Sequence, residues 1–424
     1  MPKGKRRGKS ERYERALPNS DEESVNDNAS IFSSDTKSVS DENEGDEFLQ
    51  DQFEEKLIET IEGLTQKSAQ GRTTCLLNLS KSLVSKYVPS FVSDRHFTMC
   101  DGIERCLKKG GVAERSAAAE LASIICVQLG AEDACEEVCN ALKPVLLTTA
   151  SDASVAPVVR GKCCQTLALI CFLANSEMGD ILSLMHNFET FFSGSFFKGD
   201  GSAPTLSPEI GSFHAAALSA WGLLLTTINS STIVMMMQTK SLPSIGRLAQ
   251  LLESQHLEVR MTAGDVLAVL YEIIKFENED VGEEYDEIVA NLRSLATDSH
   301  KYRAKKDRKQ QKASFRDILL YIEDDVMPDS QIKFGKEVLD LDSWAKRKQY
   351  DTLCSILGPG INIHLAENYF LRDLFEISDP IITNATNNHA QNHIEKFRKK
   401  LQNAANFKAR TISRGRNRDK RSEF

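Results

Sequence analysis

The chain has 424 residues, 41% hydrophobic and 27% charged, which is long enough for a large core and for two or three domains. Its net charge of -9 hides a strong separation, since residues 1–15 hold seven Lys or Arg and residues 21–55 hold thirteen Asp or Glu. The apolar stretch at 215–228 is shorter than the roughly 20 residues of a membrane-spanning helix, so we expect no membrane span.

Residues 1–50 form a basic block followed by an acidic block, with many Ser and few apolar residues. Such a composition buries too little apolar surface to offset the entropy of the chain, so we predict that this segment is disordered. It also lacks the apolar core of a secretory signal peptide.

A short pattern then recurs five times at intervals of 43 to 54 residues. Each copy has a polar anchor, a small side chain three positions later and, in most copies, larger apolar side chains seven and ten positions later. These offsets place the four side chains on one face of a helix, and the interval is close to the roughly 40 to 47 residues of armadillo and HEAT repeats. The anchors are Arg72, Arg115, Arg160, His214 and Arg260.

The recurrence predicts an armadillo/HEAT-like, all-α helical solenoid over residues 51–298, interrupted by a Gly-, Ser- and Pro-rich loop at 194–211. Arrays of this kind usually bind partners. The Arg anchors have two possible roles. They either line a binding groove or, as is commoner in repeats, tie adjacent repeats together through carboxylates and backbone carbonyls.

Residues 299–388 are predicted to form a basic linker helix and a small mixed α/β domain that caps the solenoid, and residues 389–424 a basic helix and tail. Alternating apolar residues and turn signals locate the elements of the α/β domain. We predict strands at 331–334, 337–341 and 361–365, and helices at 343–357 and 367–375.

Catalytic and metal-binding motifs are missing from the sequence. The ten Cys are scattered over apolar positions without a CxxC pair, which favours a reducing compartment, the cytoplasm, with the nucleus as a second location. His389 and His393 stand four apart, but no Cys or carboxylate pattern completes a zinc site. We therefore expect no catalytic residues, metal, cofactor or small-molecule substrate.

Two basic segments carry the functional prediction, one at 301–316 with eight Lys or Arg and one in the last 34 residues with eleven. Such segments suit phosphate backbones, because neutralised phosphates release counterions. A nuclear-localisation signal and a merely solubilising tail are the alternatives for the C-terminal segment. The predicted RNA-binding residues are Lys301, Arg303, Lys305, Lys306, Arg308, Lys309, Lys396, Arg398, Lys399, Lys400, Lys408, Arg410, Arg414, Arg416, Arg418, Lys420 and Arg421.

Several stretches, taken in order, resemble the interferon-related developmental regulator family. They include HKYRAKK at 300–306 and LDSWAKRKQY at 341–350. The remaining matches lie at 103–110, 295–298, 314–319, 332–335, 356–358, 364–365, 371–376 and 405–411.

The resemblance implies an armadillo-type domain followed by a family-specific C-terminal domain, and non-enzymatic regulation. It implies two kinds of partner. One is the translationally idle ribosome, bound through rRNA and ribosomal proteins, with the basic tail in a narrow RNA-lined channel. The other is a deacetylase-containing transcription corepressor complex, for which the chain would be a nuclear co-regulator.

Overall fold

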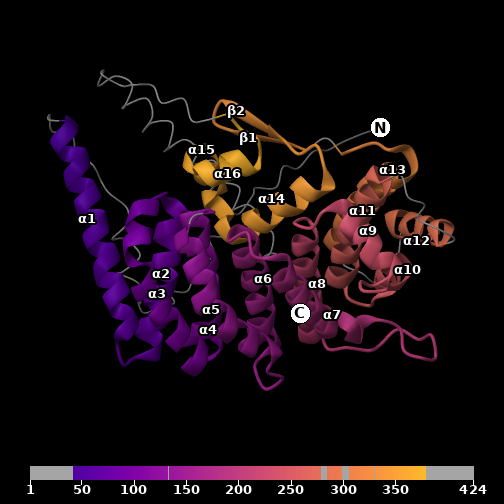
Figure 1. Ribbon diagram of the computed structural model, residues 1–424, viewed down its shortest axis with the longest axis horizontal. Coiled ribbons are helices and arrows are strands. Elements are labelled where there is room, and N and C mark those ends of the chain that lie inside the picture. The colour runs from indigo at the N-terminus through magenta and orange to yellow at the C-terminus, as the bar shows by residue number, and fades with distance from the viewer. Residues whose placement is uncertain (1–41, 132, 278–283, 298–304, 329, 379–424) are drawn as a thin grey trace, which may run out of the picture. The chain divides into compact units, whose positions relative to one another are not determined.

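Amphipathic segments fold into helices that follow one another along the chain, and Figure 1 shows their succession. Side chains are described from residue 50 within the first helix and from residue 308 within the last long helix before the strands. The computed structural model describes residues 42–131, 133–277, 284–297, 305–328 and 330–378.

One set of helices stacks into a row, row A, and the helices that connect its members pack against it as row B. A first helix, α1 (Glu42–Glu62), precedes both rows. Row A consists of α2 (Ala69–Ser85), α4 (Val112–Leu129), α6 (Pro157–Leu173), α8 (Pro208–Leu225), α11 (Leu257–Phe276) and α13 (Lys305–Asp324). Row B consists of α3 (Pro89–Lys109), α5 (Asp133–Ser151), α7 (Met178–Phe192), α9 (Ser230–Gln238), α10 (Ile245–Ala249) and α12 (Tyr285–Thr297).

A short C-terminal segment follows the rows, so the fold is the predicted helical solenoid with a small two-stranded sheet. Strands β1 (Gln331–Phe334) and β2 (Glu337–Asp340) are antiparallel, with Phe334 paired to Glu337 across a tight turn. Three helices complete the segment: α14 (Trp344–Leu357), α15 (Ile361–Glu367) and α16 (Tyr369–Leu374).

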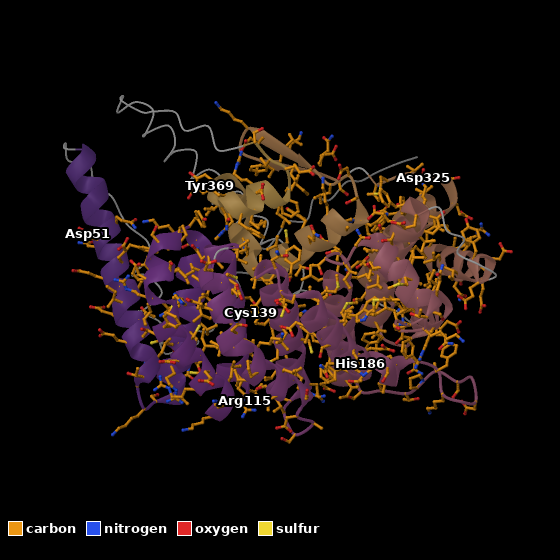
Figure 2. All side chains as sticks on the ribbon, in the orientation of Figure 1. Asp51, Arg115, Cys139, His186, Asp325 and Tyr369 are labelled. Atoms are coloured by element: carbon orange, nitrogen blue, oxygen red, sulfur yellow. The ribbon has the colours of Figure 1, made fainter. Side chains whose placement is uncertain are left out.

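The C-terminal segment runs back along row A over the carboxyl-terminal halves of its helices. The amides of Trp344 and Ala345 donate to the Glu272 carboxylate of α11 at 2.9 and 3.0 Å, and α14 then crosses α8 toward α4. Farther on, α15 contacts α2. In Figure 2, Tyr369 of α16 lies at the opposite side of the rows from Arg115, which stands near the start of α4. The segment therefore covers one half of the row A face.

This arrangement corrects two predictions. The segment does not cap the end of the solenoid, because its helices contact α2, α4, α8 and α11 rather than the last repeat alone. Residues 361–365, predicted as a strand, are helical in α15. Their alternation of apolar residues suggested one buried face, yet Ile361, Ile363, His364 and Leu365 are all buried.

The recurring register is confirmed as the core of row A. Every residue at the positions three, seven and ten after an anchor is buried except Cys75, which is half-buried. The structure adds a sixth copy in α13, where Gln311 takes the anchor position and Ile318 and Tyr321 are buried seven and ten positions later. The sequence pattern did not reveal this copy, because its anchor is Gln311 instead of Arg or His and lies within the basic segment at 301–316.

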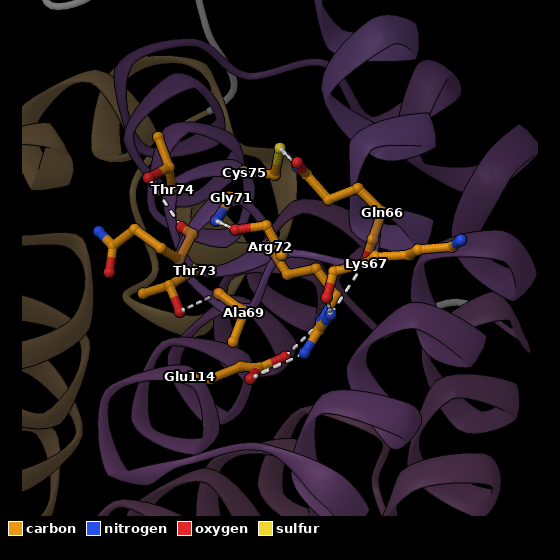
Figure 3. Close-up of polar contacts among 11 residues, drawn as sticks. Gln66, Lys67, Ala69, Gly71, Arg72, Thr73, Thr74, Cys75 and Glu114 are labelled. Atoms are coloured by element: carbon orange, nitrogen blue, oxygen red, sulfur yellow. Dashed lines mark hydrogen bonds and ion pairs between the residues drawn. The ribbon is translucent and has the colours of Figure 1, made fainter.

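The anchors tie the helices together, as the structural hypothesis predicted. Figure 3 shows Arg72 bound to Glu114 of α4 and to backbone carbonyls before α2; its Nε lies 2.6 Å from Glu114 Oε1. Arg160 donates to the Ala150 carbonyl at 2.8 Å, and Arg260 to the Ser254 carbonyl at 2.6 Å. Each of these Arg residues therefore satisfies carbonyls just ahead of its own helix, where an unpaired group would be costly.

Other predictions have mixed outcomes. Residues 1–41 lie outside the described residues, but α1 begins at Glu42 and passes through the predicted boundary at residue 50. The predicted boundaries at 298 and 388 lie outside the described residues. Eight of the ten Cys are buried, as predicted. No helix in the described part of the chain is long and apolar enough to cross a membrane.

Replacing Ala118 with Leu tests the register. Ala118 is fully buried three positions after its anchor, so the larger side chain should overpack α4 and lower the free energy of unfolding by about 1–3 kcal/mol. Ala113→Leu, on the exposed side of the same helix, is the matched control and should change it little. Equal urea denaturation midpoints for the two variants would contradict the register.

Replacing Gly360 with Ala tests the docking of the C-terminal segment. A Cβ at this position would overlap the Val84 carbonyl oxygen of α2, so we expect the free energy of unfolding to fall by about 1–3 kcal/mol. Gly179→Ala is the control, because a Cβ there meets nothing within 4 Å. Thermal melts measure both, and an unchanged melting temperature for Gly360→Ala would show that α15 does not pack against α2.

Candidate functional site

The predicted RNA-binding residues fall mostly outside the described residues. This holds for Lys301, Arg303 and the whole tail from Lys396 to Arg421, and also for His389 and His393. Lys305 and Lys306 lie in the first turn of α13, of which only the backbone is described. Among the predicted RNA-binding residues, Arg308 and Lys309 are therefore the two whose side chains the structure describes. Arg308 is half-buried and Lys309 is exposed.

Helix α13 presents a basic stripe on the side facing away from the core. Lys309 and Arg316 are exposed and stand seven positions apart, on one face of the helix, with Lys312 half-buried beside them. The opposite face holds Phe315 and Ile318, both fully buried. These two side chains lie against Gly264 of α11, so the position of the basic stripe is fixed by core packing. We refer to Lys309, Lys312 and Arg316 as the α13 stripe.

A groove lies on the half of row A that the C-terminal segment leaves uncovered. It has a volume of about 540 Å³ between the amino-terminal halves of α6, α8 and α11. Small side chains make it possible: a Cβ on Gly161 would lie 3.1 Å from that of Ala216, so α6 and α8 approach closely. Sequence reasoning did not locate this groove, because it is formed by three helices that lie far apart in the sequence.

Charges frame the groove unequally. Lys162 forms an ion pair with Glu120 at 3.3 Å, which leaves little free positive charge. Glu209 and Glu258 also line the groove, and within the described part of the chain neither forms an ion pair. Glu258 accepts a hydrogen bond from the Ser212 hydroxyl at 2.5 Å. The groove therefore combines an apolar floor with a net negative rim.

Buried charges lie where α14 meets the edge of the groove. The Lys348 ammonium is buried and donates to the Ser219 hydroxyl at 2.7 Å. Burial raises the pKa of the Asp265 carboxyl to about 6, an effect that the nearby Lys348 opposes. Burial also lowers the pKa of Lys348. A group of three or more possible metal ligands is absent from the described residues.

Comparison with known proteins gives consistent matches along the chain. The family model described as Interferon-related developmental regulator matches residues 24–323, and the Interferon-related protein conserved region matches residues 368–422. Interferon-related developmental regulator 2 of Mus musculus is 39% identical over 376 residues, which cover 88% of this chain and 84% of that protein. Interferon-related developmental regulator 1 of Homo sapiens is 36% identical over 397 residues, 93% of this chain and 86% of that protein. An engineered protein of known structure gives a TM-score of 0.41 at 16% identity, over 63% of this chain and 98% of its own.

Replacing Asp265 with Asn tests the buried charges by their pH dependence. The unfolded carboxyl titrates near pH 4 and the folded one near 6, so the folded state binds more protons in between, and its stability falls as the pH rises through that window. In Asp265→Asn this fall is absent. Between pH 4 and pH 7, the free energy of unfolding of the variant, measured by urea denaturation, should rise by about 2–3 kcal/mol relative to that of the parent.

The exposed Asp340→Asn is the control for this measurement. A difference between the Asp265→Asn variant and the parent that is independent of pH would show that Asp265 is hydrated in the folded protein.

Proposed function

The chain belongs to the interferon-related developmental regulator family, and from this premise we propose that it is a non-enzymatic regulator that binds translationally idle ribosomes. It makes its contacts through rRNA, with the basic C-terminal tail inside an RNA-lined channel. Ribosomal proteins are further partners. The protein acts in the cytoplasm, with the nucleus as a second location.

The observation that carries this proposal is the α13 stripe. Its Lys and Arg side chains project from a helix whose other face is buried against α11, so the charges are presented in a fixed arrangement. Positive charge on a fixed helix suits a folded RNA surface, because phosphate contacts then require no ordering of the backbone. The eleven basic residues from Lys396 to Arg421 supply the same chemistry in the tail.

Co-sedimentation with ribosomes in a sucrose gradient tests the proposal. Truncation after Ile394 should abolish co-sedimentation at physiological salt, because it removes the eleven basic tail residues. Changing Lys309 and Arg316 to Gln should weaken binding less than the truncation does. It should also make binding less sensitive to salt. The slope of the logarithm of the binding constant against the logarithm of the salt concentration should become shallower by roughly 0.7–0.9 for each phosphate that is no longer neutralised.

Replacing two exposed lysines elsewhere, Lys81 and Lys198, by Gln gives a control with the same change of charge. Full co-sedimentation of the truncated chain would contradict the role of the tail. If the full-length protein never sediments with ribosomes, the proposal fails, and the alternative of a nuclear scaffold for deacetylase-containing corepressor complexes takes its place.

A further inference from the structure

The groove between α6, α8 and α11 has an apolar surface without a partner in the described part of the chain. Val158 on its α6 side is 57% exposed, although it lies beside the buried residues Phe213 and Ala215. Exposed apolar surface framed by charge is typical of a site that binds a peptide segment. The carboxylates of Glu209 and Glu258 on the rim favour a positively charged occupant.

The C-terminal tail of the same chain has the matching chemistry. Its eleven Lys and Arg residues include Lys396 and Arg410, and Phe397 and Phe407 lie among them. An aromatic ring of the tail would pack on the apolar floor of the groove, and basic side chains beside it would contact the Glu residues of the rim.

The groove is within reach of the tail. The described chain ends at residue 378, soon after Asn368 donates to the Val127 carbonyl of α4 at 2.8 Å. Packed helices lie about 8–10 Å apart, so α8 is about 20 Å from α4. The fifteen residues from 379 to 393 span up to roughly 50 Å when extended, which is ample for the basic part to arrive at the groove.

We propose that the groove between α6, α8 and α11 binds the basic C-terminal tail of the same chain when no RNA is present. The tail then has two exclusive positions, one in the groove and one on RNA. The position of the tail on RNA rests on the proposed function, whereas its position in the groove does not. Binding in the groove shields the positive charge of the tail from unrelated nucleic acids and makes the affinity for ribosomes adjustable.

Photo-crosslinking of the full-length protein tests the first position. A p-benzoylphenylalanine in place of Val158, in ribosome-free and RNA-free protein, should crosslink to residues 389–424. The yield should not change when the protein is diluted, because the reaction is intramolecular. The same photo-crosslinker in place of Phe97, which is exposed on α3 in row B, is the control and should give no tail crosslinks. Crosslinks that disappear on dilution, or none to the tail, would overturn the proposal.

The rim charges give a second measurement. Changing Glu209 and Glu258 together to Gln should lower the crosslink yield severalfold and raise the affinity for ribosomes about two- to tenfold, since less of the tail is held back. Glu55→Gln with Glu59→Gln, exposed on α1, provides the same charge change as a control. Unchanged crosslinking in the rim variant would contradict the charge argument. Strong crosslinking in a protein that never sediments with ribosomes would reject the proposed function and leave the groove assignment standing.

Discussion

Hydrogen bonds to the carboxyl ends of row A helices hold the C-terminal segment in place, and the division of the row A face into a covered and an open half follows from them. The last carbonyls of a helix have no partner within it. His364 Nε2 lies 3.2 Å from the Leu83 carbonyl at the end of α2, and Asn368 donates to the Val127 carbonyl at the end of α4. Burial lowers the pKa of His364 to about 4, so the ring is neutral, and the contact with a carbonyl oxygen assigns its single N–H to Nε2. Both side chains are fully buried, so neither bond can be exchanged for one to water.

With the carboxyl halves covered, the row A face is divided into two regions. The covered half is closed by α14, α15 and α16, and at its border the buried Lys348 is bound to Ser219. The other half keeps the groove between α6, α8 and α11 open. The α13 stripe has a separate origin, since Phe315 and Ile318 pack against Gly264 of α11 and turn its basic side outward. The described part of the chain thus presents two surfaces of different character, one positive and one apolar with a negative rim.

The sequence predicts the helical rows well because the spacing of small and apolar residues within each repeat indicates which face of the helix is buried. The small residue at Ala118 or Ala263 marks close helix contacts, and local periodicity alone locates them. Long-range contacts are beyond such reasoning. Residues 361–365 alternate as a strand would, but they form a helix that packs against α2, a contact between segments far apart in the sequence. The groove could not be predicted for the same reason, because it depends on how closely α6, α8 and α11 pack, and these helices are distant in sequence.

Native-state hydrogen exchange can establish whether α15 and α16 form one cooperative unit with the helices of row A. We expect the amides of α15 and α16 to open with the same free energy as those of α2 and α4, because the Leu83 carbonyl of α2 and the Val127 carbonyl of α4 join them. Exchange of α15 and α16 at a much lower free energy, while α4 stays protected, would contradict this. The C-terminal segment would then separate from row A while the rows stay folded, and the division of the row A face would not be a fixed property of the fold.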